Sequence, residues 1–399
     1  MLVPTSLWLL LSGLAPLSAL KISVSGRCQW LFAPVALLFS ISPLLLGELT
    51  LLSSMMGMWF LGLWLFRCRL YLKPGFIILT YCIALAAAIC LSAQDFITLL
   101  IGLEVYTFAT AFLLLSGHNN SGCRKCVLRF LLLSAVMSAI YLLGCSLLYV
   151  QFGSLSFEAL NQASVKADHI TNISNVLILG FLLFKLGCAP FHTWLIELYR
   201  NASYMTVLFL DTVWKFLIVV VFVQVIDIST LSGGRNMIYP FAIISMLVGA
   251  FLPIFQSDIR KFLASSSVGH IGLMLAALIP STHGAPEAAT NYAAYYAISS
   301  GCFIIGIMKA EAQHFHQLQG TMTYSPLAAW LVLLSMFAMA GMPPFGNFLA
   351  KLDIFKLLAS SQNYVLLSVA AVHSVLSIVY IIKWGRFLFH EQFPHHKIN

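Results

Sequence analysis

The sequence predicts an all-α polytopic membrane protein, and composition, apolar runs and the distribution of positive charge all point the same way. Across 399 residues, 60% are apolar and only 9% are charged. The mean hydropathy is +0.94, whereas a soluble domain uses roughly a quarter charged residues. The long apolar runs lack the two-residue alternation of barrel strands, so helices are expected to cross the bilayer.

About thirteen helices of membrane-spanning length are expected, since a span takes about 20 mostly apolar residues. They lie near 4–20, 29–46, 49–66, 75–92, 96–116, 127–150, 172–199, 204–227, 238–255, 262–280, 289–308, 325–360 and 364–386. The first run also suits a signal peptide in length, but it has no basic residue before Lys21. A signal peptide normally begins with basic residues, so this run is retained as a helix.

Positive charges between the spans fall almost entirely on one side. One side receives Lys21, Arg27, Arg67, Arg69, Lys73, Arg124, Lys125, Arg200, Arg260, Lys261, Lys309, Lys383, Arg386 and Lys397, and the other receives Lys166 and Arg235. Loops rich in lysine and arginine stay on the cytoplasmic side. The N-terminus is therefore expected outside and the C-terminus in the cytoplasm or mitochondrial matrix.

Two predicted spans carry a lysine beside helix-breaking prolines. Lys185 precedes Pro190, and Lys351 follows Pro343 and Pro344. Proline opens the backbone of a helix, which is tolerated at depth where protein or a water-filled cavity satisfies the freed groups. Broken helices near 185–194 and 341–351 are typical of transport sites built from inverted repeats. The expected organisation is a three-helix segment (1–74), two inverted five-helix repeats (75–230 and 238–388) and a short inner tail (389–399).

The five basic residues not assigned to either side fall within predicted spans and are joined there by three acids, and each such group costs about 2.5–3.5 kcal/mol or more to insert. They are Glu104, Arg129, Lys185, Asp211, Lys215, Lys351, Asp353 and Lys356. Arg129 and Lys356 lie near span ends, from which long side chains reach the surface. The central lysines are interpreted as functional, because burial and a nearby carboxylate act in opposite directions on the pKa of a lysine. Asp211 lies one helical turn before Lys215 and can pair with it.

Five motifs occur in the order found in the antiporter-like subunits of respiratory complex I. They are Gly-Leu-Glu104-Val, Phe184–Trp194, Asp-Thr-Val-Trp-Lys215-Phe, Gln256–His270 and Gly341–Lys351. The resemblance covers roughly residues 94–380 and is strongest to the chain N branch, also called NADH dehydrogenase subunit 2. Asp211 is an additional acid relative to the family pattern.

The resemblance implies a proton pathway through this chain. Glu104 would hold Lys185 and set its proton affinity, Lys215 and His270 would form a central hydrophilic axis, and Lys351 would pass the proton onward. The candidate modulators are Asp211, Asp353 and His192. His373 is expected to be a hydrogen-bonded core histidine.

The resemblance also implies which groups lie elsewhere. No redox cofactor, metal or catalytic side chain is expected in this chain, and NAD, FMN, iron–sulfur clusters and quinone would belong to other subunits. The expected partners are the membrane-arm subunits and the lipid bilayer, with quinone only indirect and no nucleic acid. The membrane would be the bacterial cytoplasmic or the mitochondrial inner membrane. The alternatives are a subunit of a multisubunit Na⁺/H⁺ antiporter, a membrane-bound hydrogenase subunit, or a non-conducting scaffold.

Overall fold

The computed structural model describes residues 74–117, 121–162, 169–226, 228, 234–282 and 284–389. The first three predicted spans and the tail beyond residue 389 lie outside the described residues. The chain divides into two compact units, Met1–Ala88 and Ile89–Asn399.

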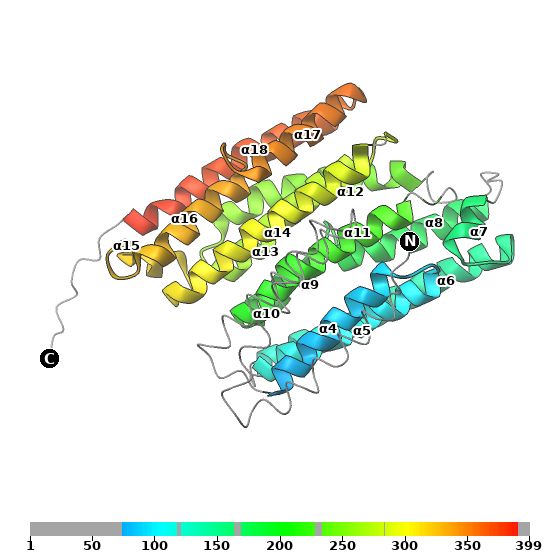
Figure 1. Ribbon diagram of the computed structural model, residues 1–399, viewed down its shortest axis with the longest axis horizontal. Helices are drawn as coiled ribbons and strands as arrows, with labels where there is room; N and C mark the ends of the chain where they lie inside the picture. The colour runs from blue at the N-terminus through cyan, green and yellow to red at the C-terminus, as the bar shows by residue number, and fades with distance from the viewer. Residues whose placement is uncertain are drawn as a thin grey trace, which may run out of the picture. The chain divides into compact units, whose positions relative to one another are not determined.

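The regular structure of the described residues is helical, without a β-strand (Figure 1). The long α-helices are α4 (Pro74–Leu91), α5 (Phe96–Gly117), α6 (Ser121–Phe152), α8 (His169–Leu186), α11 (Lys215–Ile226), α12 (Arg235–Phe251), α13 (Ile259–Ala277), α14 (Gly284–Ala310), α16 (Pro326–Ala340), α17 (Gly346–Ser360) and α18 (Tyr364–Gly385). The shorter elements are α7 (Phe157–Gln162), α9 (Thr193–Asn201), α10 (Tyr204–Phe209), η4 (Leu210–Trp214), η6 (Leu252–Phe255), η7 (Phe315–Leu318), α15 (Thr321–Tyr324) and η8 (Arg386–Phe389). Seven candidate spans in this part of the chain are long and apolar enough to cross a membrane.

Each predicted span that falls on described residues coincides with helix. The span predicted at 172–199 is α8 followed by α9, and the span at 325–360 is α16 followed by α17. Each break contains a cis proline peptide bond, Ala189–Pro190 and Pro343–Pro344. The expected breaks near 185–194 and 341–351 are therefore present, while the inverted relation of the two repeats stays a prediction.

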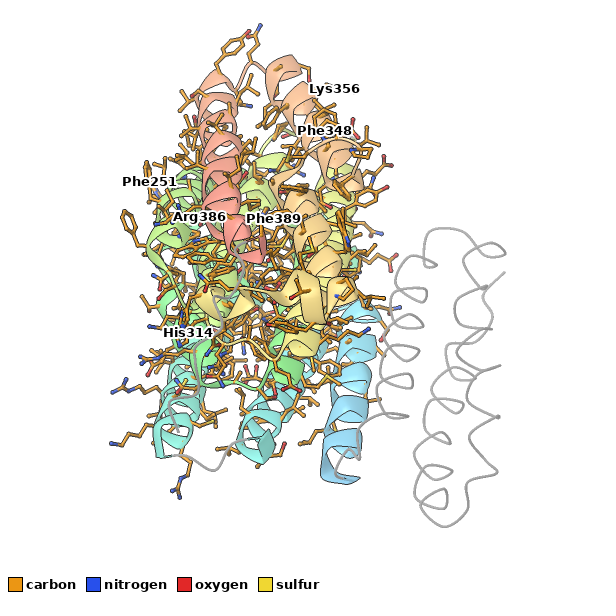
Figure 2. All side chains as sticks on the ribbon, turned by 90° about the vertical axis from the view of Figure 1, so that its left-hand side faces the viewer. Phe251, His314, Phe348, Lys356, Arg386 and Phe389 are labelled. Atoms are coloured by element: carbon orange, nitrogen blue, oxygen red, sulfur yellow. The ribbon has the colours of Figure 1, made fainter. Side chains whose placement is uncertain are left out.

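Helix α13 forms the centre of the second half of the bundle and is buried along nearly its whole length. It packs against α12, α14, α17 and α18. The α12–α13 contact is close, since a Cβ on Gly249 would lie 2.0 Å from the backbone nitrogen of Gly269. Apolar side chains such as Phe251 and Phe389 project from the outside of the bundle (Figure 2). An apolar exterior around a polar-lined interior suits a protein dissolved in lipid.

Three connections that the charge pattern predicts on the inner side meet at one end of the bundle. The guanidinium of Arg260 donates to the carbonyl of Ala202 at 2.9 Å, and the hydroxyl of Tyr204 donates to the carbonyl of Ala312 at 2.6 Å. These bonds join the connections near 200–203, 256–261 and 311–320. The alternation of helix direction assumed in the charge count therefore holds across this part of the chain.

Candidate functional site

The ammonium of Lys185 is completely enclosed and has a full set of acceptors. It donates to Oε1 of Glu104 at 2.9 Å, to Oγ1 of Thr107 at 2.7 Å and to Oγ of Ser134 at 2.7 Å. The hydroxyl of Ser138 donates to the same Glu104 oxygen at 2.6 Å. An ammonium has three protons to donate, so this site is saturated. The predicted Glu104–Lys185 contact is present, between α5, α6 and the last turn of α8.

The break after α8 connects this pair to the next lysine. Gly187 has φ +78°, a left-handed conformation that ends the helix two residues after Lys185. The freed carbonyl of Lys185 accepts from the indole nitrogen of Trp214 at 3.0 Å. Tyr106 stacks on Trp214 with ring centroids 4.0 Å apart. The backbone of Lys185 is thereby tied to the turn that precedes Lys215.

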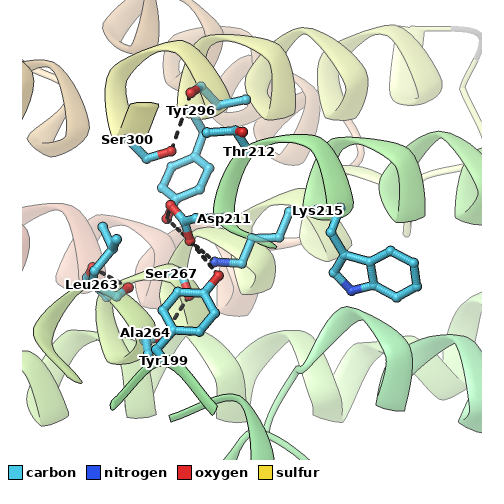
Figure 3. A network of polar contacts seen from close by, with 12 residues as sticks. Tyr199, Asp211, Thr212, Lys215, Leu263, Ala264, Ser267, Tyr296 and Ser300 are labelled. Atoms are coloured by element: carbon cyan, nitrogen blue, oxygen red, sulfur yellow. Dashed lines mark hydrogen bonds and ion pairs between the residues drawn. The ribbon is translucent and has the colours of Figure 1, made fainter. Parts of the chain in front are cut away.

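Asp211 and Lys215 form a second buried ion pair one helical turn apart, as predicted. The side chain of Lys215 is 1% exposed and that of Asp211 is 0% exposed. Figure 3 shows Asp211 between two tyrosines, with the lysine reaching it from the same helix. The hydroxyl of Tyr199 donates to Oδ1 at 3.0 Å, and the hydroxyl of Tyr296 donates to Oδ2 at 3.1 Å. The carboxylate therefore has both oxygens satisfied, which a buried charge requires.

Asp211 lies on a π-helical turn, η4, between α10 and α11, and Lys215 is the first residue of α11. Widening of a helix by one residue exposes backbone groups and recurs at functional sites. The hydroxyl of Thr212 donates to the carbonyl of Leu208 at 2.7 Å. The turn carries Asp211 into contact with α9 and α14, whose tyrosines hold it.

His270 lies on α13, next to the tyrosine that binds Asp211. Its ring is 4.6 Å from that of Tyr296, and its Nδ1 pairs with the hydroxyl of Tyr292 at 2.7 Å. Both Lys215 and Lys351 lie close enough to interact with it electrostatically. The two predicted residues of the central axis, Lys215 and His270, are thus brought together through Tyr296 rather than by direct contact.

Lys351 lies in the first turns of α17, behind the second break. Its ammonium donates to the carbonyl of Ala340 at 2.7 Å. Gly341 has φ +76°, and a Cβ there would lie 2.7 Å from Cδ of Lys351. The glycine is required twice, because L-residues rarely adopt this φ and because the lysine fills the space.

Two predicted modulators lie apart from this line. Asp353 is 60% exposed and pairs at 3.4 Å with Lys356, which is itself 75% exposed. Residues 351 and 353 are two positions apart on a helix and so point in different directions. His192 is half-buried at the first break, just before α9, and makes no side-chain capping bond.

Sequence reasoning missed the neutral members of the site and misjudged one histidine. Thr107, Ser134 and Ser138 enclose the first ion pair, and Tyr199 and Tyr296 enclose the second. Serine, threonine and tyrosine are common in membrane helices, so only their spacing on a shared helix face could have indicated a role in the site.

His373 is completely buried, as expected of a core histidine, but it lacks the expected hydrogen bond to another described residue. Among the residues that the structure describes, neither of its ring nitrogens has a hydrogen-bond partner.

Known proteins match this architecture. The family model for the transmembrane region of NADH:quinone oxidoreductase and Mrp antiporter subunits matches residues 93–377. A protein of Pelobacter propionicus named NADH-quinone oxidoreductase subunit N is 30% identical over 302 residues, covering 75% of this chain and 65% of that protein. The chain thus spans a little under two thirds of that relative's length.

Solved structures share the fold. A chain of respiratory complex I from Thermus thermophilus aligns with a TM-score of 0.70 and 23% identity, covering 79% of this chain and 71% of that chain. A chain of an archaeal membrane-bound sulfane sulfur reductase aligns with a TM-score of 0.84 and 18% identity, covering 98% of this chain and 90% of that chain.

Proposed function

Because the chain belongs to the NADH:quinone oxidoreductase/Mrp antiporter transmembrane family, we propose that it is a proton-translocating membrane subunit of NADH:quinone oxidoreductase, the counterpart of subunit N. The naming of the subunit N relatives supports this assignment. In this role the chain couples quinone reduction in other subunits to proton transfer along its own buried side chains.

The observation that carries the proposal is the presence of two buried ion pairs, tied together by the hydrogen bond from the Trp214 indole to the carbonyl of Lys185. Lys185 with Glu104, and Lys215 with Asp211, place four charges inside the bundle. Replacing a buried ion pair with apolar residues is often neutral or stabilising, so such pairs are weak evidence of a structural role. A scaffold needs no such charges. Coupled ionisable groups in contact exchange protons as a unit, which is what a pump requires.

Other membrane-arm subunits and lipid cover the apolar exterior, and NAD, FMN, iron–sulfur clusters and quinone reside in those other subunits. The protein is integral to a bacterial cytoplasmic or mitochondrial inner membrane, with its N-terminus outside and its C-terminus inside. Glu104, Lys185, Lys215, His270 and Lys351 carry the proton, and Asp211 modulates Lys215.

The multisubunit Na⁺/H⁺ antiporter and the hydrogenase remain alternatives, because the fold is common to several membrane complexes. Purification of the tagged chain in mild detergent separates them. We expect NADH- and quinone-binding subunits to co-purify and NADH to drive proton uptake into inverted vesicles. Co-purification with antiporter or hydrogenase subunits alone would refute the assignment to complex I.

A matched pair of variants tests the role of the buried charges. Lys185→Ala is expected to abolish most NADH-driven pumping while the complex still assembles. Arg129→Ala is the control, since it also removes the cation of a 3.0 Å ion pair, with Glu197, but one that is exposed. Exposed pairs contribute about 0–1 kcal/mol, so this variant should pump normally. Full pumping by an assembled Lys185→Ala complex would favour the scaffold.

A further inference from the structure

Two buried histidines from different helices meet in the second half of the bundle. His270 on α13 and His373 on α18 are both completely buried, and their rings lie edge to face with centroids 5.5 Å apart. The His373 ring reaches the backbone of α13 because residue 269 is glycine. A Cβ there would lie 2.2 Å from Nε2 of His373, which the two helices could not accommodate.

The two rings carry unused hydrogen-bonding capacity. Nδ1 of His270 is hydrogen-bonded to the hydroxyl of Tyr292, and its Nε2 has no partner among the described residues. Both ring nitrogens of His373 are buried, and neither has a hydrogen-bond partner among the described residues. More than about nine in ten buried polar groups have a partner, and buried waters commonly supply it. Three buried nitrogens without a partner are therefore unexpected in a histidine pair that serves only packing.

Lys351 lies near this pair of histidines. It interacts electrostatically with both His373 and His270. Its ammonium uses one of three donors on the carbonyl of Ala340, and Ser377 donates to that same carbonyl at 3.4 Å. Ser377 follows His373 by one helical turn, so this face of α18 is directed at the second break. His373 thus contacts the central histidine and lies one helical turn from a serine that shares its acceptor with the lysine of α17.

We propose that His373 is a proton-relay residue that carries protons between His270 and Lys351, with buried water completing the contacts. The proposal deepens the proposed function and rests on it. A neutral imidazole accepts a proton at its free nitrogen and becomes imidazolium. It then releases the proton from its other nitrogen to the next group, so one proton enters and one leaves. No bond to carbon changes and no electron moves.

Variants of His373 in the assembled complex test the proposal. His373→Phe preserves a planar ring without a proton-carrying nitrogen, and His373→Gln provides a smaller polar side chain. Both are expected to lower NADH-driven pumping about tenfold or more, because a positioned proton carrier contributes about 10²–10⁴-fold. Residual turnover should show a larger solvent isotope effect in D₂O, which a packing defect would not cause. His316→Gln, at an exposed histidine outside the bundle core, is the control and should behave as the unaltered complex.

The outcomes distinguish this proposal from the proposed function. Full pumping in an assembled His373→Phe or His373→Gln complex, with pumping lost in Lys185→Ala, would overturn the relay alone. Full pumping in Lys185→Ala would overturn the proposed function itself. If neither His373 variant assembles, a high-resolution map of the unaltered complex decides. The relay requires water within about 3.2 Å of a ring nitrogen of His373, and its absence would refute the proposal.

Discussion

The Glu104–Lys185 pair yields a quantitative prediction through a double-mutant cycle. The perturbations are Glu104→Gln, Lys185→Met and the two combined. Glutamine keeps the shape and the hydrogen bond from Ser138, while methionine keeps most of the unbranched length of lysine. Each single variant leaves one charge without its ionic partner in an environment where the lysine is 1% exposed and the glutamate 23% exposed.

The magnitude follows from the 2.9 Å separation of Nζ and Oε1. At an effective dielectric constant of about 20, two unit charges at that distance attract by about 6 kcal/mol. The cost of removing both charges from water offsets much of this attraction. Breaking such a pair on one side costs about 3–5 kcal/mol, whereas replacing both charges is close to neutral. We therefore expect each single variant to be destabilised and the double variant to regain most of that loss, with a coupling energy of about 6 kcal/mol or more, because the two single losses add to that amount and the double loss is small.

The assay separates stability from activity. The midpoint of thermal dissociation of the complex and the fraction assembled on native gels report stability, and NADH-driven pumping reports function. The double variant should assemble nearly as well as the unaltered chain and still fail to pump. Losses of stability that simply add across the two sites would refute the reasoning, because they would mean that the two groups do not interact.

Three further predictions concern other parts of the chain. Asp211→Asn should lower pumping strongly because it leaves a buried ammonium without its carboxylate, whereas the exposed Asp353→Asn should not; equal effects in the same vesicle assay would contradict the structure. Gly341→Ala should weaken pumping in assembled complexes, since the added methyl group enters the space of the neighbouring lysine at positive φ; unchanged pumping would show that the bend tolerates a side chain. A cysteine at Glu158 should react with impermeant thiol reagents from outside and one at Arg124 only from inside; the reverse pattern would invert the topology.

The sequence predicted the helical spans and the charged members of the site because both carry large free energies. A charge at bilayer depth is costly enough that its presence signals a partner, which is why Glu104, Lys185 and Lys215 could be identified. The breaks were predictable for a similar reason, since proline cannot continue a helix without losing a backbone hydrogen bond. Asp353 illustrates the limit, because hydropathy places it within a span although its side chain faces outward.

The neutral side chains could not be predicted, because their importance depends on helix rotation and helix contacts. Tyr199 and Tyr296 converge on Asp211 from helices separated by almost 100 positions in the sequence, and one residue of helix rotation would point them elsewhere. The π turn that presents Asp211 has no sequence signature. His373 was misjudged for the same reason, since its environment depends on the close approach of α13 and α18 at a single glycine.

The two breaks, after α8 and after α16, differ in whether substitutions would reveal the hydrogen-bond partners of the nearby lysine. At the first break, side chains bind Lys185, so replacing any of them changes its surroundings. At the second break, the partner of Lys351 is the main-chain carbonyl of Ala340, which every amino acid possesses. An alanine scan would therefore find the lysine but pass over its acceptor. Substitutions that disturb this contact can therefore act only on the lysine itself or on the residues that set the curvature of the break.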